Sequence, residues 1–563
     1  MQLGVRFRAI ALASVGLFVI AACGGGGEST NVKEGGTLTF VIDADAQTLN
    51  PFEVGDLPSA RAVAPMFPNL YMADKNLSIV PDLADGMPTV SSDLKTWTVK
   101  LRKNAKWSDG SAITANDVVT TVRIEANSKL DTDAAFDWSP LTDPVNGVTA
   151  KDDNTVVFTL TSTFAPFLAV NLAGFVAPAS VYGQIDPAKM RNDPSNTKPT
   201  VTGGPFLFDK WIPGQQIELV ANPNYYAGKP HIAKIIEKVI TNTTAAAQAV
   251  VNGDVNWDPE VVGAAVSTVQ NVPGVNTYIY PDLGYYDVRF NDRPKWINGQ
   301  PSLFGDVNVR RAFAYALDKD SMVKAATDGH GTPLWGDIVP ASAYYDESAT
   351  VKYKQDVAKA KSLMDAAGWT VGSDGIRVKN GQRFSAKFYV RADKPQRIKA
   401  VEIMSEQLRA IGMDLQPTPT DFKVFYKPIQ AGNFDLALAG WGLALDPDDY
   451  TIFHSSFIRP ENNSSGTNWT GYINKDLDAA IDAERSDLKP TAAATFAARK
   501  ADFAKIQHIL GDDVVVYFLW ADNTGMAFNG VNGVVAGNGN SLNYADQGRN
   551  PQIFSTWSLS NPK

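Results

Sequence analysis

The sequence predicts an α/β fold, or a mixed α+β one, that is divided into more than one lobe. Two segments alternate apolar and polar residues with a period of two, as half-buried strands do: 96–101 and 155–160. Residues 37–42, after two glycines, are predicted to form an opening strand. In the second half of the chain apolar residues recur instead at helical spacing, and these segments alternate with strand-like ones. The chain has 563 residues, which is too long for a single hydrophobic core, so we expect two or three domains.

The first 23 residues have the pattern of an export signal. Arg6 and Arg8 form a short basic region, and residues 9–22 are uncharged and mostly apolar. This run is too short to cross a bilayer as a helix, which takes roughly 20 residues. It ends at Cys23, the only cysteine of the chain, in a setting that resembles a bacterial lipobox. We predict a signal peptide over 1–22 and a lipid on Cys23, with an ordinary signal and an incidental cysteine as the alternative.

The composition excludes several classes of protein. A single cysteine leaves no intramolecular disulfide and no Cys-based metal site. The formal charge is −9, and it becomes −11 once residues 1–22 are removed, so we expect no nucleic-acid partner. The four histidines are not paired at metal-ligand spacing, and no Gly-x-Ser-x-Gly motif marks a nucleophile. We therefore expect no metal, no cofactor and no catalytic residues.

Local signals place the elements of the first half. Residues 24–30 are rich in glycine, so a flexible tether is expected over 23–34 before the strand 37–42. Pro51 disfavours a helix before it, which predicts a loop after that strand. Thr114 is placed to cap a helix that begins near Val118. Residues 184–202 are polar and contain three prolines, which predicts a loop and a candidate domain boundary.

The second half holds the clearest helices. Apolar stripes predict helices over 309–317, 357–367 and 398–411. Gly368 and Gly412 end the last two, because glycine tolerates a positive φ. Two further segments have the apolar character of strands: 434–439 and 514–520.

The aromatic residues point to a ligand cleft. The chain has 12 Trp, 18 Tyr and 27 Phe residues, and several lie beside turn-forming residues rather than in periodic stripes. Large aromatic side chains offer flat apolar contact with little entropy to lose, which suits ligand binding. The alternative for any single one is ordinary packing in a core.

Several motifs, taken together, resemble the large solute-binding lipoproteins of ABC importers, the oligopeptide, dipeptide and nickel-binding class. The stretch 101–110 followed by 114–118 is the most diagnostic of them. The others occur in the family's order along the mature chain: 35–38, 47–51, 203–206, 222–226, 309–318, 366–369 and 434–441.

The resemblance implies a fold like the type II periplasmic binding proteins of cluster C, with two main lobes, a hinge and an inserted lobe. Lobe I would comprise 35–67, 203–285 and 522–563. The inserted lobe II would span 68–202, and lobe III would span 286–521. The chain would cross between lobes I and III near 285–290 and 520–523, and closure about this hinge would bury the ligand.

The resemblance also implies ligand-binding residues. Gly440, Trp441 and Gly442 match the strand end that lines the family's cleft, and Phe422 falls where many members have a tryptophan facing the ligand. A second set matches the lobe I segment that pairs with an extended peptide through its main chain: Asp45, Ala46 and Gln47.

One departure from the family affects the expected ligand. Peptide binders usually have an aspartate three residues after the cleft tryptophan, where it holds the ligand's amino group, and this chain has Ala444 there. An arginine that some members use for a ligand carboxylate corresponds to Leu438. A buried ammonium without a counter-charge is costly, so either Asp446 replaces that aspartate or the ligand has no free amino terminus.

The implied function is capture of an oligopeptide outside the cytoplasm and its delivery to an ABC permease with its ATPases. We expect a monomer that is anchored to the outer face of the cell membrane by its lipid. Three alternatives remain at this point. The ligand could be an uncharged oligosaccharide, or a nickel complex bound near His454, or the protein could be an exported hydrolase.

Overall fold

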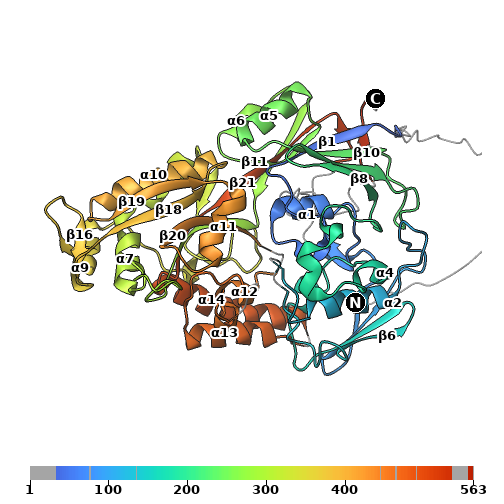
Figure 1. Ribbon diagram of the computed structural model, residues 1–563, viewed down its shortest axis with the longest axis horizontal. Coiled ribbons are helices and arrows are strands. Elements are labelled where there is room, and N and C mark those ends of the chain that lie inside the picture. The colour runs from blue at the N-terminus through green and yellow to red at the C-terminus, as the bar shows by residue number, and fades with distance from the viewer. Residues whose placement is uncertain are drawn as a thin grey trace, which may run out of the picture. The chain divides into compact units, whose positions relative to one another are not determined.

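A mixed sheet of twelve strands organises the part of the chain that the structure describes. Its strands are β1 (Thr37–Ile42), β8 (Phe206–Ile212), β9 (Gln216–Ala221), β10 (Lys234–Val239), β11 (Trp257–Val261), β12 (Val275–Pro281), β13 (Gly284–Phe290), β14 (Gly331–Pro333), β18 (Ser385–Arg391), β19 (Asp414–Thr420), β20 (Leu436–Gly442) and β21 (Val516–Asn529). Ten of them follow the order β19-β18-β20-β13-β21-β11-β1-β10-β9-β8, and β12 and β14 also pair with β21 (Figure 1).

The computed structural model describes residues 33–74, 78–132, 134, 136–443, 446–462, 466–489, 491–534 and 556–561. These residues all fall in one unit of the chain, Lys33–Lys563. The predicted signal peptide and Cys23 lie outside the described residues, as does Ala444, so the roles assigned to them stay predictions.

The long strand β21 joins the two halves of the sheet. Its first residues pair with β13, where Val516 lies opposite Arg289, and its last residues pair with β12, where Ala527 lies opposite Thr277. The sequence predicted a strand over 514–520 only. The observed strand, Val516–Asn529, continues past Trp520 because its later residues pair with β14, β12 and β11. The polar Asp522 within it is buried and accepts a hydrogen bond from the Trp520 indole (2.8 Å).

Separate hydrophobic cores form on the two halves. One core gathers residues between Val288 and Trp520 around β13, β18 and β20. Another gathers residues between Leu38 and Leu559 around β1, β9 and β10. These cores agree with an organisation in lobes, and the lobe boundaries stay a prediction.

A third core belongs to a smaller antiparallel sheet, which lies within the predicted insertion. The sheet has the order β4 (Thr89–Val90), β5 (Thr96–Lys100), β7 (Thr155–Thr159) and β6 (Val148–Asp152). Helix α2 (Ala115–Glu125) packs beside it. The backbone N–H of Thr114 donates to the Asp117 carboxylate (2.7 Å), so the predicted helix start is confirmed.

The remaining helices lie mostly in the second half of the chain. They are α1 (Leu57–Val63), α3 (Phe167–Val170), α4 (Ala179–Tyr182), α5 (Thr243–Asn252), α6 (Ala265–Val269), α7 (Val307–Ala316), α8 (Lys319–Ala326), α9 (Val357–Ala366), α10 (Pro395–Arg409), α11 (Phe422–Gln430), α12 (Tyr450–Phe453), α13 (Lys475–Ser486) and α14 (Ala492–Asp512). Short strands complete the inventory: β2 (Tyr71–Ala73), β3 (Ile79–Pro81), β15 (Thr370–Val371), β16 (Arg377–Lys379), β17 (Gln382–Arg383), β22 (Val531–Asn532) and β23 (Ser558–Leu559).

The three helices predicted from apolar stripes are confirmed as α7, α9 and α10. Gly368 and Gly412 follow the last two with φ of 79° and 85°, in the left-handed region that favours glycine. None of the helices in the described ranges is long and apolar enough to cross a membrane.

The predicted loop 184–202 contains two short helical turns of the 3₁₀ type. They span Pro187–Asn192 and Pro194–Asn196. Asp186 and Asp193 each precede one of them and accept a backbone N–H at 3.1 and 2.8 Å. The prolines that suggested a loop instead start these turns, because a fixed φ and a missing N–H suit the first helical position.

Candidate functional site

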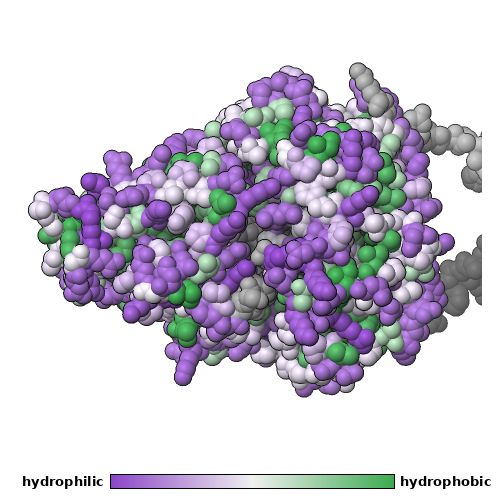
Figure 2. Space-filling model, in the orientation of Figure 1, coloured by the Kyte–Doolittle hydropathy of each residue, from purple (hydrophilic) through white to green (hydrophobic). Residues whose placement is uncertain are grey.

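A cavity of about 830 Å³ opens beside the join between the two halves of the sheet. It is lined from one side by the loop after β1 and by α1, and from the other by α11 and the ends of β18 and β20. A second cavity of about 640 Å³ adjoins it, since Gln47, Thr197 and Lys423 line both. On the face of the molecule drawn in Figure 2, hydrophilic residues predominate and hydrophobic ones form small groups.

One wall of the larger cavity is aromatic. The rings of Trp441 and Trp469 have their centroids 4.9 Å apart, and Tyr426 lies 5.4 Å from Trp469. Phe422 continues the row at 5.9 Å from Tyr426. Such contiguous faces bind apolar groups or sugar rings without ordering flexible chains.

The end of β20 depends on a glycine. In the pairing of β13 with β20, Tyr286 lies opposite Gly440. A Cβ at position 440 would lie 2.6 Å from two carbons of the Tyr286 ring, so only glycine lets the ring lie there. The Arg397 guanidinium covers that ring at 4.3 Å from its centroid.

The floor of the cavity is ionic. Lys394 donates to Asp43 at 2.8 Å, and Arg391 lies 3.5 Å from the same oxygen of Asp43. Arg61 approaches the other oxygen at 3.6 Å and pairs with Glu260 at 3.1 Å. These residues lie just after β1 and in α1 and β11 on one side, and at the end of β18 and just before α10 on the other, so their charges join the two halves of the sheet.

This network determines which acids are ionised. Burial alone would raise the pKa of Asp43, but the charges of Lys394, Arg391 and Arg61 hold it below its ordinary value. By contrast, burial raises the pKa of the neighbouring Asp258 to about 7. The ionised acids of the floor are thus those that have cationic partners.

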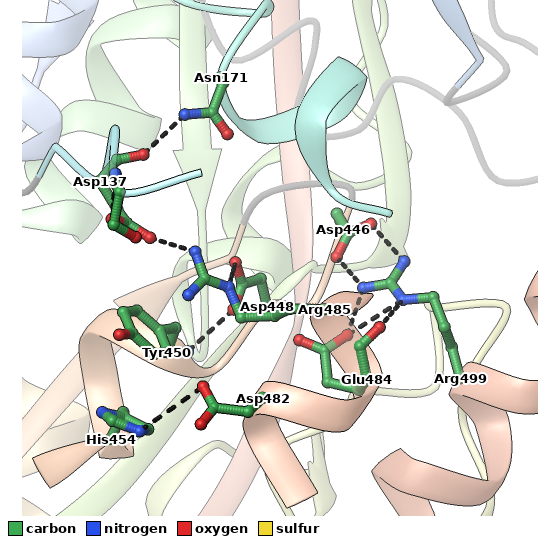
Figure 3. Close-up of polar contacts among 11 residues, drawn as sticks. Asp137, Asn171, Asp446, Asp448, Tyr450, His454, Asp482, Glu484, Arg485 and Arg499 are labelled. Carbon is green, nitrogen blue, oxygen red and sulfur yellow. Dashed lines mark hydrogen bonds and ion pairs between the residues drawn. The ribbon is translucent and has the colours of Figure 1, made fainter. Parts of the chain in front are cut away.

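The acidic loop after β20 is neutralised by two arginines (Figure 3). Arg499 binds both oxygens of Asp446, at 2.6 and 2.7 Å, and also donates to Glu484 at 2.6 Å. Arg485 pairs with Asp137 of the predicted insertion and, at 3.2 Å, with Asp448. The loop is therefore fixed against α13 and α14 by ion pairs.

The structure brings most of the predicted ligand-binding residues to the two cavities. Gln47, Phe422, Gly440, Trp441 and Gly442 line the larger one. Asp45 and Ala46 line the smaller one with Gln47. Asp45 is also bound by the Trp211 indole (3.0 Å) and by the backbone N–H of Gly214 (2.9 Å).

Two predicted residues lie elsewhere. Asp446 is not among the residues that line either cavity, because its carboxylate faces Arg499. His454, considered for a nickel complex, stacks on Tyr450 at 4.3 Å and also lies outside both linings. Within the described ranges no group of three or more His, Cys, Asp or Glu side chains could hold a metal ion.

Sequence reasoning missed the cations of the floor. Lys394 and Arg397 lie at the N-terminal end of α10, where the helix dipole disfavours positive charge. Two cations just before the predicted helix 398–411 were the signal that could have singled them out.

The comparisons with known proteins agree with this architecture. The family model described as bacterial extracellular solute-binding proteins, family 5 (middle part), matches residues 78–464. Oligopeptide-binding protein AppA of Bacillus subtilis is 27% identical over 502 residues, 88% of each chain. Protein XP55 of Streptomyces lividans is 31% identical over 457 residues, 81% of this chain and 78% of its own.

A solved structure gives the same result for the fold. The oligopeptide-binding protein AppA from Bacillus subtilis in complex with a nonapeptide superimposes with a TM-score of 0.83 at 25% identity, covering 94% of this chain and 100% of that one. The predicted fold class and the family resemblance are confirmed. The chain belongs to the bacterial extracellular solute-binding proteins of family 5.

Proposed function

We propose that this protein captures an oligopeptide outside the cytoplasm and delivers it to the permease of an ABC importer. The observation that carries the proposal is the pair of adjoining cavities, bordered by the loop 45–47 and by the end of β20. The larger cavity alone, at about 830 Å³, lies in the upper part of the range of small-molecule sites, and the second adds to it, so the space is large enough for a chain of several residues. The relative of known structure holds a nonapeptide.

In this proposal the ligand lies between lobe I (35–67, 203–285, 522–563) and lobe III (286–521), with 68–202 as the inserted lobe II. Strands β13 and β21 both run through the join of the two halves, which supports a hinge there. Closure about such a hinge would couple affinity to the closed form that a permease reads.

Calorimetry on ligand-stripped protein tests the proposal. The full chain is unfolded and refolded to release any retained ligand. Native mass spectrometry before and after this step gives the mass of what was released. Mixtures of peptides of two to nine residues are then titrated. We expect heat and a rise in Tm with some of them. Neither heat nor a thermal shift at millimolar peptide would contradict the proposal.

An uncharged oligosaccharide is the second candidate. The row of aromatic rings from Phe422 to Trp441 favours it, since sugar rings stack on such faces. The pairing of Asp446 with Arg499 also leaves that acid unavailable to a ligand amino group. Binding of oligosaccharides but of no peptide in the same titration would select this alternative.

We also propose that Cys23 carries the lipid that holds the protein at the outer face of the membrane. Its place after an apolar run of signal type supports this. In cells, Cys23→Ser is expected to move the protein from the membrane fraction to the soluble exported fraction. Ligand affinity should stay unchanged. A variant that remains in the membrane fraction would contradict the lipid anchor.

A further inference from the structure

The last turn of α13 contacts the predicted insertion, residues 68–202. Arg485 of this helix forms an ion pair with Asp137, and both side chains are only 8% exposed. The Arg485 guanidinium also lies over the Phe164 ring, 4.6 Å from its centroid. Asn171 donates to the Asp137 carbonyl at 2.7 Å and so fixes the segment that presents the acid (Figure 3). Either charge would be costly to leave in these surroundings without the other.

The same helix end accepts hydrogen bonds from the insertion. The backbone N–H of Ala165 donates to the Arg485 carbonyl at 2.7 Å. The Thr163 hydroxyl donates to the Ser486 carbonyl at 2.7 Å. The last carbonyls of a helix have no partner within it, so the insertion helps to cap α13. Leu488, just after the helix, packs against the hydrophobic core of the insertion. We call this set of residues the α13 contact: Asp137, Thr163, Phe164 and Ala165 with Arg485, Ser486 and Leu488.

The α13 contact lies apart from the strands that join the two halves of the sheet. In Figure 1 α13 lies at the lower edge, beside the insertion, whereas β21 crosses between the halves above it. Within the described ranges, none of the residues of the α13 contact lines either cavity. The insertion continues at both ends into the predicted lobe I, so its contacts with the predicted lobe III are noncovalent. An opening of the cleft about β13 and β21 can therefore separate them.

Arg485 also connects the α13 contact to the wall of the larger cavity. Its Nε lies 3.2 Å from Asp448, on the acidic loop after β20, and its guanidinium covers the Tyr450 ring at 3.6 Å from the centroid. Gly442, at the end of β20, lines the larger cavity. One arginine thus contacts both the insertion and the loop that continues this wall, so the position of the loop and the α13 contact depend on each other.

We propose that the α13 contact is a latch that holds the cleft closed. It forms when lobe III moves against the insertion, and it breaks when the cleft opens and water replaces the partners of Asp137 and Arg485. Its polar character is typical of contacts between domains that move relative to each other. A latch slows the escape of a ligand, because release requires the open form. The inference rests on the proposed function in that the insertion moves with lobe I.

Cross-linking measures the latch without any ligand. Ser162 and Ser486 are exposed, and they lie on the two sides of the α13 contact, since Thr163 binds the Ser486 carbonyl. Ser162→Cys and Ser486→Cys are introduced into the Cys23→Ser protein, which has no other thiol. A short bismaleimide joins the two cysteines only while the contact is made. The rate of cross-linking in ligand-free protein therefore reports the closed fraction.

Variants assign this rate to the ion pair. We expect Asp137→Asn to slow the cross-linking by about fivefold or more, because Arg485 loses a buried charged partner, and Asp137→Glu to keep part of the rate. Asp374→Asn is the matched control, since it removes an exposed acid that pairs with Arg383 within lobe III, and it should leave the rate unchanged. Equal rates with Asp137 and with Asp137→Asn, or no cross-link in either protein, would overturn the latch.

Peptide binding separates the latch from the proposed function. A hexapeptide that binds in the calorimetric titration should raise the cross-linking rate of the protein with Asp137 intact. Asp137→Asn should release this peptide about fivefold faster in stopped-flow measurements, and Asp374→Asn should not. Unchanged cross-linking and unchanged release would make the contact a static part of the fold and overturn the latch. If no peptide binds, peptide capture is contradicted, and the ligand-free rates still decide the latch.

Discussion

Lys394 Nζ lies 2.8 Å from Asp43 Oδ2, although the two residues are 351 positions apart in the chain. Asp43 follows β1 in one half of the central sheet, and Lys394 precedes α10 in the other. Both are buried, and the same carboxylate also faces Arg391 and Arg61. This contact therefore links the two halves of the sheet beneath the cavity.

We expect Asp43→Asn to lower the free energy of unfolding by about 3 kcal/mol, because it leaves buried cations without their counter-charge. Urea denaturation at neutral pH measures this. The pKa of Asp43 is lowered on folding, so its contribution is present above the unfolded value near 4 and is lost as the pH falls below it. The variant and the wild type should thus converge in acid.

The matched control is Glu402→Gln, which removes an exposed carboxylate from α10. It should change stability by no more than about 0.5 kcal/mol. If Asp43→Asn is as stable as this control at neutral pH, the ionic floor is not a stabilising contact between the halves.

The contribution of Glu125 to the free energy of unfolding should depend on pH with the opposite sign to that of Asp43. Burial raises its pKa to about 8, and its main described contact is the Trp138 indole at 2.9 Å. A carboxyl whose pKa is raised on folding stabilises the protein fully in acid, and this contribution is lost as the pH rises from about 4.5 through 8.

Glutamine at position 125 keeps the hydrogen-bond acceptor and removes this ionisation. We expect Glu125→Gln to match the wild type at pH 4 and to exceed it by about 2 kcal/mol at pH 8, measured by urea unfolding at both values. A stability difference that does not change with pH would show that folding does not raise the pKa of Glu125.

Asp446 tests whether the ligand has an anchored amino group. Since Arg499 binds both of its oxygens, we expect Asp446→Asn to leave peptide affinity within a factor of two. The free energy of unfolding should fall by about 2 kcal/mol, because Arg499 loses a charged acceptor. Calorimetry and urea unfolding measure the two effects. A tenfold loss of affinity would instead assign Asp446 to the ligand.

Local sequence signals predicted those parts of the fold that depend on neighbouring residues. The capping pair of Thr114 and Asp117, the glycine stops after α9 and α10, and the period-two strands β5 and β7 are all short-range features. The cleft residues Phe422 and Gly440–Gly442 came from the family resemblance, and the structure places them on the larger cavity.

The ionic floor could not be predicted in the same way. Asp43, Arg61 and Lys394 meet only because the sheet order places β1 beside β11, β11 beside β21, and β21 beside β13. Nothing local in the sequence specifies that order. The length of β21 was missed for a related reason, since its buried polar residues interrupt the apolar run.

Gly440 tests the packing of the cleft. In Gly440→Ala the added methyl would lie 2.6 Å from the Tyr286 ring, so the ring must move. The Arg397 guanidinium, which lies over that ring, then loses the contact. We expect a loss of about 1–3 kcal/mol in stability by urea unfolding. Gly174→Ala, at an exposed site with open space around the added carbon, should be neutral. Equal stability of both variants would mean that the Tyr286 ring moves aside at no cost in free energy.

The last prediction concerns the aromatic wall of the larger cavity, and its test separates an effect on ligand binding from an effect on stability. Trp441 is half-buried and faces the cavity, so Trp441→Ala removes ring area that the ligand would cover and should weaken binding at least tenfold, about 1.4 kcal/mol. Phe496→Ala removes another partly exposed ring, stacked on Tyr344 at 4.9 Å outside both cavities, and should leave the affinity unchanged. Because both variants shorten an aromatic side chain, an equal effect on affinity would point to a general loosening of the protein. A loss confined to Trp441→Ala, with the enthalpy of binding reduced in the same titration, would identify this wall as a surface that the ligand contacts.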